Sequence, residues 1–204
     1  SIRVGKVHSM IPNNVLIATD EYVRLTEPES LKKSGLIDYE RGGVALGDSS
    51  EGLNSYNWTL TVKDKYKAML SREGQGEVQV YEYPSRPIDI AFCFDQSMNV
   101  VLAWQDTNFN LFLRRYSTSL NAFSVVPFGL GKCPRLTLDE KRPEFIGNSD
   151  VIFAYISNKS LIYRVQREGY NIEHVVEDDM LGSQRLARIG LKAFRLQLIL
   201  TPKG

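Results

Sequence analysis

Residues 88–126 read IDIAFCFDQSMNVVLAWQDTNFNLFLRRYSTSLNAFSVV, and this stretch decides the fold. It contains apolar runs of four to eight residues, rich in aromatic and β-branched types and separated by Asp, Asn and Ser. This pattern is typical of β-strands joined by turns, and no long window shows apolar residues at helical spacing. We therefore expect four consecutive strands, near residues 88–95, 99–106, 111–116 and 123–126.

The layout of residues 90–126 recurs in residues 134–176. A strand that ends in Asp comes first, and an apolar strand with Ala followed by an aromatic residue comes second. A strand with Arg at its fourth position comes third, and a fourth strand closes the unit. The marked positions repeat at spacings of 44, 51 and 50 residues, in the pairs Asp95 and Asp139, Ala103 and Ala154, and Arg114 and Arg164.

This repeat predicts the fold class. Four short strands in about 45 residues is the spacing of a β-propeller blade, although the consecutive meanders of a β-sandwich give the same pattern. A weaker third copy covers residues 43–83, with strands near 58–62, 66–71 and 77–83. The sequence thus predicts an all-β fold of consecutive four-stranded antiparallel units, arranged as β-propeller-like blades or as a β-sandwich.

Three segments are expected along the chain. Residues 1–41 form an N-terminal arm or hairpin with a short helix over Thr26–Gly35, which has a cap, an early proline and a closing glycine. Residues 42–192 form the blade-like domain. Residues 193–204 form a C-terminal strand.

The C-terminal strand is a candidate interface. Alternation places large apolar side chains on one face and two polar side chains on the other. Such a strand either completes its own sheet or augments the sheet of a neighbouring subunit, and we favour the second outcome, which makes it an assembly element. The candidate interface residues are Phe194, Arg195, Leu196, Gln197, Leu198 and Leu200.

Composition excludes some classes of partner. The chain has 204 residues, with 25 Lys and Arg against 24 Asp and Glu, so its net charge is +1. This balance argues against a polybasic nucleic-acid binder. No apolar run approaches the roughly 20 residues that cross a bilayer. Cys93 and Cys133 are expected to be buried thiols in a reducing compartment, and they form a disulfide only if their Cα atoms lie within about 7 Å.

Templates for catalysis do not match. The chain lacks G-x-S-x-G and H-E-x-x-H, and Gly129–Lys132 departs from a phosphate-binding loop. His174 is expected to be a satisfied or surface histidine. Carboxylate pairs such as Asp139 and Glu140 are typical of solvated turns. The sequence therefore predicts no enzyme, no cofactor and no metal site.

The segment Lys132–Pro143 is dense in alternating charges between two prolines. We expect structural ion pairs here, in which Asp139 pairs with a nearby cation and fixes the crossing between two units; an interface role is the alternative. The residues assigned to this structural motif are Pro134, Arg135, Asp139, Lys141, Arg142 and Asp150.

Several motifs resemble those of a family of tail-associated structural proteins of tailed bacteriophages. The similarity covers roughly residues 42–200, and its most specific part is Cys133–Pro143. The other motifs are Gly52–Asn54 with Trp58–Thr59, Ala91–Gln96 with Met98–Asn99, Ser149–Tyr155 with Tyr163–Arg167, and Phe194–Leu198. The resemblance implies a location in the virion and no reaction.

The function expected from this resemblance is a non-enzymatic structural component of a phage tail, at the tip, baseplate, collar or nozzle. It would be assembled in the host bacterial cytoplasm as a homo-oligomer around the tail axis, and its partners would be tube, baseplate, tip or fibre proteins. The alternative is a receptor- or carbohydrate-binding module of the tail, and a glycan-cleaving tail enzyme is a distant third. The exposure of the Trp58 and Trp104 rings distinguishes the carbohydrate-binding alternative from a purely structural role, because sugars stack on exposed aromatic rings.

Overall fold

The computed structural model describes residues 3–7, 22–23, 58–72, 76–95, 97, 99–138, 150–182, 184–192 and 195–200. These residues form fifteen strands and one short 3-10 helix, η2 (Gln166–Glu168). The strands are β1 (Arg3–Val7), β2 (Tyr22–Val23), β3 (Trp58–Lys63), β4 (Lys67–Arg72), β5 (Glu77–Glu82), β6 (Pro87–Phe94), β7 (Val100–Asp106), β8 (Asn110–Ser117), β9 (Ala122–Leu130), β10 (Lys132–Leu138), β11 (Val151–Ser157), β12 (Ser160–Val165), β13 (His174–Glu177), β14 (Leu186–Lys192) and β15 (Arg195–Leu200). The expected helix over Thr26–Gly35 lies outside the described residues.

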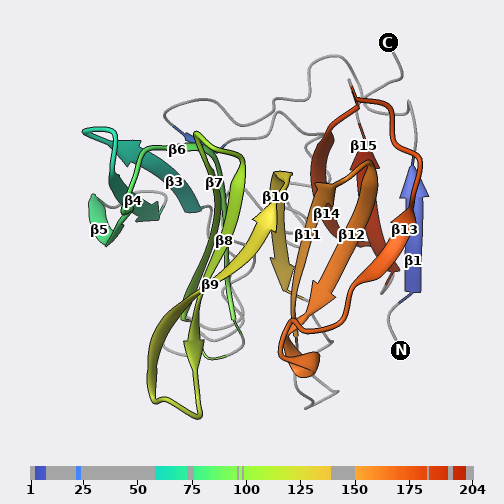
Figure 1. The fold of residues 1–204 in the computed structure, drawn as a ribbon. Helices are drawn as coiled ribbons and strands as arrows, with labels where there is room; N and C mark the ends of the chain where they lie inside the picture. Colours follow the sequence, from blue (N-terminus) through green and yellow to red (C-terminus); the bar gives the residue numbers. More distant parts are fainter. Residues whose placement is uncertain are drawn as a thin grey trace.

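The strands assemble into four sheets that follow one another along the chain (Figure 1). Sheet 1 has the order β2-β3-β4-β5, sheet 2 the order β6-β7-β8-β9, and sheet 3 the order β10-β11-β12-β13. Sheet 4 has the order β1-β15-β14. Every pairing within sheets 1 to 3 is antiparallel. The prediction of an all-β fold built from consecutive four-stranded antiparallel units is confirmed.

The sequence repeat corresponds to an equivalence in strand register. In sheet 2, Ala103 pairs with Leu113 and the next pair along β8 contains Arg114. In sheet 3, Ala154 pairs with Tyr163 and the next pair contains Arg164. Both alanines are fully buried, and each faces the sheet that follows in the chain. The spacings of 51 and 50 residues therefore relate positions of the same structural role.

The third, weaker copy is sheet 1. Its strands β3, β4 and β5 match the three predicted strands within two residues. Its first strand, β2, comes from residues 22–23 and pairs with β3. Strand β1 also joins a sheet with later strands. The described strands of the N-terminal arm are therefore parts of sheets 1 and 4 and do not form a hairpin with each other.

Neighbouring sheets pack face to face, and each interface has its own apolar core. The core between sheets 1 and 2 includes Leu60, Leu70, Tyr83, Phe92 and Trp104. The core between sheets 2 and 3 includes Ala91, Leu113, Leu136, Phe153 and Tyr155. The core between sheets 3 and 4 includes Ala154, Leu161, Ile189, Leu198 and Leu200.

Sheets 2 and 3 are thus covered on both faces. Each neighbouring pair of sheets packs as the layers of a sandwich do, and the four sheets together form a stack in chain order. Strand β10 lies beside both β6 and β14, which places the leading strands of successive sheets next to one another as in propeller blades. Figure 1 shows β3–β5 and β14–β15 at opposite ends of this stack.

Arg114 and Arg164 occupy equivalent positions in the repeat, and each contacts an aromatic ring on or next to the last strand of the preceding sheet. The Arg114 guanidinium lies 4.8 Å from the Tyr81 ring of β5 and 4.0 Å from the Phe123 ring of β9. The Arg164 guanidinium lies 5.0 Å from the Phe128 ring of β9 and donates to the Tyr155 hydroxyl. Cation–π contacts of this kind recur because both arginines face the preceding sheet at the same register position.

Strand β15 lies in the middle of sheet 4. It pairs in parallel with β1 on one side and antiparallel with β14 on the other. Leu198 and Leu200 are fully buried in the core between sheets 3 and 4. The expectation that this strand augments a neighbouring subunit's sheet is therefore wrong for the folded chain, because both of its edges are already paired.

Candidate docking site

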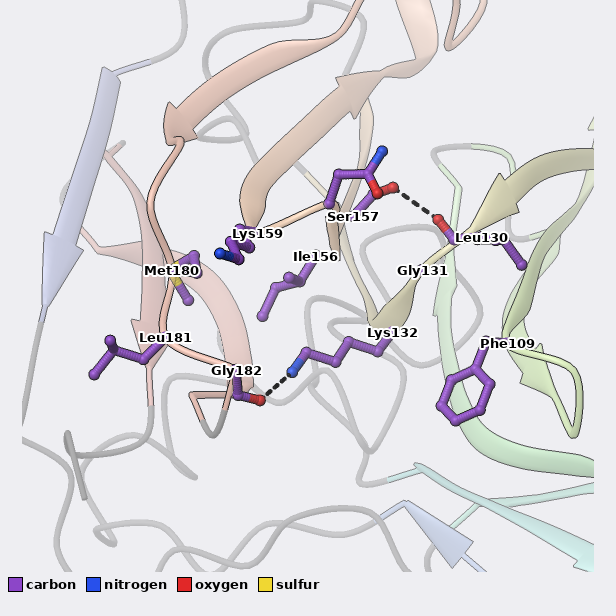
Figure 2. A pocket seen from close by; sticks show the side chains of 11 residues that line it. Phe109, Leu130, Gly131, Lys132, Ile156, Ser157, Lys159, Met180, Leu181 and Gly182 are labelled. Atoms are coloured by element: carbon purple, nitrogen blue, oxygen red, sulfur yellow. Dashed lines mark hydrogen bonds between the residues drawn. The ribbon is translucent and has the colours of Figure 1, made fainter.

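A recess of about 210 Å³ opens between the loop ends of sheets 2 and 3 (Figure 2). We call it the loop recess. Four connections build it: the β7–β8 hairpin, the crossing from β9 to β10, the β11–β12 hairpin, and the segment between β13 and β14. Its lining is mainly apolar. The lining residues are Phe109, Leu130, Gly131, Lys132, Ile156, Ser157, Asn158, Lys159, Met180, Leu181 and Gly182.

The β7–β8 hairpin is fixed by Asp106. One carboxylate oxygen of Asp106 accepts hydrogen bonds from the backbone N–H groups of Asn108 and Asn110, at 2.8 and 2.9 Å. The same Asp–Asn arrangement, four residues apart, closes the β6–β7 turn at Asp95. Side-chain capping of this kind replaces missing backbone partners in turns. The loop is therefore held in one shape.

Phe109 occupies an unusual position in that loop. Its φ of +63° is in the left-handed region, where glycine or asparagine is favoured and a bulky side chain is uncommon. The Phe109 carbonyl accepts a 2.8 Å hydrogen bond from the Gly131 N–H, which ties the hairpin to the β9–β10 crossing. The aromatic side chain is nevertheless 55% exposed. Neither turn preference nor burial explains a phenylalanine here.

Gly131 allows the crossing to pass close to the sheets. A Cβ atom at this position would lie 2.4 Å from a Leu111 methyl carbon and 2.8 Å from the Ile156 carbonyl oxygen. A residue with a side chain at position 131 would clash with these atoms, so glycine is required there. On either side of it, Leu130 is 64% exposed and the Lys132 ammonium donates a 2.9 Å hydrogen bond to the Gly182 carbonyl.

The β11–β12 hairpin supplies the second cation of the loop recess. Asn158 and Lys159 form its two-residue turn, with φ values of +48° and +64°. The Lys159 carbonyl accepts a 2.8 Å hydrogen bond from the Met180 N–H, and Ser157 donates to the Leu130 carbonyl at 2.7 Å. These bonds join the turn to the two neighbouring segments.

The loop recess has a buried floor and an exposed apolar rim. Ile156 and Met180 are only 3% and 2% exposed. Phe109, Leu130 and Leu181 form the rim and expose about half or more of their surface. In the view of Figure 2, Phe109 and Leu181 lie on opposite sides, with the Lys132 side chain running between them. Apolar side chains gathered around a concavity are typical of a binding surface.

Arg135 has a structural role, and one of its partners is Asp89 of the neighbouring sheet. Its guanidinium donates to the Asp89 carboxylate at 2.9 Å, and both side chains are buried. Arg185 lies 3.6 Å from the other oxygen of the same carboxylate. This cluster of the buried Asp89 and Arg135 with the partly exposed Arg185 joins sheets 2 and 3 to the segment that leads into sheet 4. Asp139, Lys141 and Arg142 lie outside the described residues.

The other residues of this motif are also placed within the sheets. Pro134 lies in β10, and its carbonyl accepts a 2.6 Å hydrogen bond from Arg135. Asp150 is buried just before β11, and its carboxylate lies 3.7 Å from the Arg167 side chain. The interpretation of this segment as structural pairing fits these described contacts.

Two of the candidate interface residues of β15, Leu198 and Leu200, have buried side chains. Both belong to the core, as described above. The backbones of Arg195, Leu196 and Gln197 pair with both β1 and β14. Phe194 lies outside the described residues.

Among the side chains that could take part in catalysis, those of His174 and the two cysteines are described, whereas Asp139 and Glu140 lie outside the described residues. His174 lies 2.6 Å from the Glu168 carboxylate and stacks on the Tyr163 ring. Cys93 and Cys133 are buried free thiols, and burial raises the pKa of both. Within the described part of the chain, no group of three or more His, Cys, Asp or Glu is placed to hold a metal ion. The same residues include no helix of sufficient length and apolarity to span a bilayer.

The two tryptophans do not form an exposed platform. Trp104 is 1% exposed and stacks on Phe112 in the core between sheets 1 and 2. Trp58 is half-buried, with its ring 5.0 Å from that of Phe94. Trp104 is therefore a core residue.

The comparisons with known proteins add no relative. Searches against protein-family models, curated proteins and solved structures find no match to this chain.

Proposed function

We propose that the chain is a non-enzymatic structural component of a bacteriophage tail, located in the virion. In this role it docks tube, baseplate, tip, collar, nozzle or fibre proteins and is present in several copies around the tail axis. The tail assignment rests on the motif resemblance over residues 42–200. The observation that carries the docking role is the exposed apolar rim of Phe109, Leu130 and Leu181 around the loop recess.

A docking scaffold must hold its contact surface in a fixed position. The stacked sheets meet this requirement, because the Arg114 contact connects sheet 2 to sheet 1, and the Asp89–Arg135 pair and the Arg164 contact connect sheet 3 to sheet 2. The loops that form the recess are joined by backbone and side-chain hydrogen bonds. Binding to such a surface loses little conformational freedom, which favours tight docking.

The alternative, a carbohydrate- or receptor-binding module, has less support. Trp104 is buried and Trp58 is half-buried, so neither offers a fully exposed ring to a sugar. The recess is also smaller than the roughly 300–1,000 Å³ that small-molecule sites usually occupy. Docking of a protein segment accounts better for its size and its apolar rim.

Purified virions provide the test. We expect the chain in density-purified particles of the phage that encodes it, with antibody label confined to the tail. A phage lacking the gene should regain normal tails when supplied with the wild-type protein or with Leu120→Ser, a variant at an exposed leucine outside the recess. Phe109→Ser with Leu181→Ser should restore fewer tails. Absence of the protein from purified particles would contradict the proposal.

A further inference from the structure

We propose that the loop recess binds one apolar side chain carried by an acidic segment of a partner protein. This inference rests on the proposed function, because it names the chemistry of the partner that docks there. Three properties of the described residues carry it: the size of the recess, the conformation of its rim and the sign of its charges.

The size of the recess matches a single anchor. A volume of about 210 Å³ above a floor of Ile156 and Met180 accommodates one leucine- or phenylalanine-sized group. Protein interfaces typically concentrate their binding energy in a few such side chains, each inserted into a pocket of the partner. The rim residues Phe109, Leu130 and Leu181 would pack around that group and exclude water from it.

The backbone conformation at the rim favours a role of Phe109 in contacting the partner protein. Phe109 and Lys159 each occupy a left-handed position at the tip of a hairpin between the second and third strands of a sheet. Asn-Gly is the favoured sequence in such turns. Asparagine or glycine in place of Phe109 would relieve the backbone and remove an exposed apolar ring. We therefore infer that the aromatic side chain of Phe109 is useful because it contacts a partner protein.

The charges of the recess select the partner's flanking residues. Lys132 and Lys159 are two of its eleven lining residues, and none of the eleven is acidic. The bond to the Gly182 carbonyl fixes the Lys132 ammonium at the rim, and Lys159 is exposed. Asp178 and Asp179 precede Met180 but do not line the recess. Carboxylates beside the anchor would pair with both lysines, whereas basic flanks would be repelled.

Short peptides of defined sequence test the inference with the purified full-length chain. The probe is acetylated Ser-Gly-Asp-Leu-Glu-Gly-Ser amide, and its binding is followed by the amide resonances of the ¹⁵N-labelled protein. We expect saturable shifts at Gly131, Lys159 and Leu181. Replacing the leucine of the peptide with alanine should weaken binding by about tenfold or more, because most of the buried apolar surface is lost. Replacing both acids with lysine should weaken it by about fivefold.

Two pairs of variants separate the apolar and electrostatic contributions. Lys159→Glu should abolish the preference for acidic over basic flanks, whereas Lys65→Glu should keep it. Lys65 is the matched control because it is an exposed lysine with a positive φ in the β3–β4 hairpin, outside the recess. Phe109→Ser should weaken binding of the acidic leucine peptide, and Leu120→Ser should not.

The opposite results overturn the inference. It fails if no peptide shifts these resonances, if basic and acidic flanks bind equally, or if Lys159→Glu keeps the wild-type preference. Sedimentation of the protein alone is the second measurement. A dimer that Phe109→Ser dissociates would assign the recess to a second copy of the chain. Because these measurements use purified protein, they can fail while the protein is found in tails, and they can succeed while it is absent from virions.

Discussion

The Tyr83 hydroxyl is buried between sheets 1 and 2 and has no hydrogen-bond partner among the described residues. Its ring packs against Trp104, with the two centroids 5.1 Å apart. A buried hydroxyl without a partner loses its hydration and gains nothing in exchange. The same burial raises the pKa of the Tyr83 phenol.

The first prediction concerns Tyr83→Phe. At about pH 7 we expect the free energy of unfolding to stay the same or to rise by up to about 1 kcal/mol, because the unpaired hydroxyl is removed. As pH rises above the ordinary tyrosine value of 10.0, unfolded chains release this proton while folded chains keep it. The unfolded state then binds fewer protons, so wild-type stability falls with increasing pH.

Urea denaturation at about pH 7 and about pH 10.5, on either side of the ordinary tyrosine value, measures both effects. The loss of stability between the two pH values should be smaller for Tyr83→Phe than for the wild type. Tyr66→Phe, at an exposed tyrosine, is the control for removing a hydroxyl. An equal alkaline loss in Tyr83→Phe and the wild type would contradict the assignment to this phenol.

At the scale of the strand, two buried alanines determine how closely successive sheets pack. Ala103 faces sheet 3 and Ala154 faces sheet 4, both fully buried and at equivalent register positions. The second prediction is that Ala103→Leu and Ala154→Leu each lower the free energy of unfolding by about 1–3 kcal/mol, because the added methylenes overpack the interface. Urea denaturation measures the loss.

Ala122→Leu is the matched control for this pair, because Ala122 lies in β9 with its side chain exposed. It should change stability by no more than about 0.5 kcal/mol. Unequal losses at Ala103 and Ala154, one near zero, would mean that the two repeat units pack differently.

The third prediction concerns the contact between β6 and β10. Arg135→Met removes a buried cation from Asp89 and should lower the free energy of unfolding by about 3–5 kcal/mol, because a buried carboxylate loses its closest partner. The double variant Asp89→Leu with Arg135→Met should recover much of that loss. Urea denaturation of the two single variants and the double variant gives the coupling energy. If the double variant is as unstable as Arg135→Met, packing rather than charge explains the loss.

At this scale the sequence predicts the strands well. Short apolar runs bounded by turn residues locate β6 to β8 within about a residue, since strands that are buried on both faces, such as β6 and β7, need apolar residues at nearly every position. The repeat also locates Ala103 and Ala154, because equivalent strands need small residues at equivalent contacts. The pairing of Arg135 with Asp89 could not be predicted in this way, because the two residues are 46 positions apart along the chain. No local pattern specifies that pairing, which depends on how two sheets stack.

The loop recess could not be predicted for the same reason. Its residues come from four separate connections, and only the packing of the sheets against one another brings them together. One local signal was available at Asn108–Asn110, where an aromatic residue stands in a turn that favours glycine or asparagine. The role expected for β15 was wrong because an apolar strand face is equally consistent with a core and with an interface.

At the scale of the whole molecule, β15 holds sheet 4 together. The fourth prediction is that deleting residues 193–204 prevents cooperative folding, because it removes the central strand and the buried Leu198 and Leu200. Circular dichroism and gel filtration of the purified variant should show lost strand signal and aggregation.

A point variant makes the same claim testable in a folded protein. Leu198→Ala should lower the free energy of unfolding by about 2–5 kcal/mol, the usual cost of a buried leucine-to-alanine change. A truncated chain that stays folded and monomeric, together with a Leu198→Ala protein of wild-type stability, would restore an assembly role for this strand.

The parallel pairing of β1 with β15 also sets an order of events during folding. Arg3 pairs with Arg195, so sheet 4 is completed only after a loop of roughly 190 residues closes, at an entropic cost of about 4–5 kcal/mol. Sheets 2 and 3 require only short hairpins and are expected to form much sooner. Strand β1 has five residues and lies at the edge of its sheet, so we expect it to be the last strand to dock and the first to detach. Its amide hydrogens should therefore exchange with solvent ahead of those of β14, and each detachment exposes an edge of β15 to which the β1 strand of another molecule can bind.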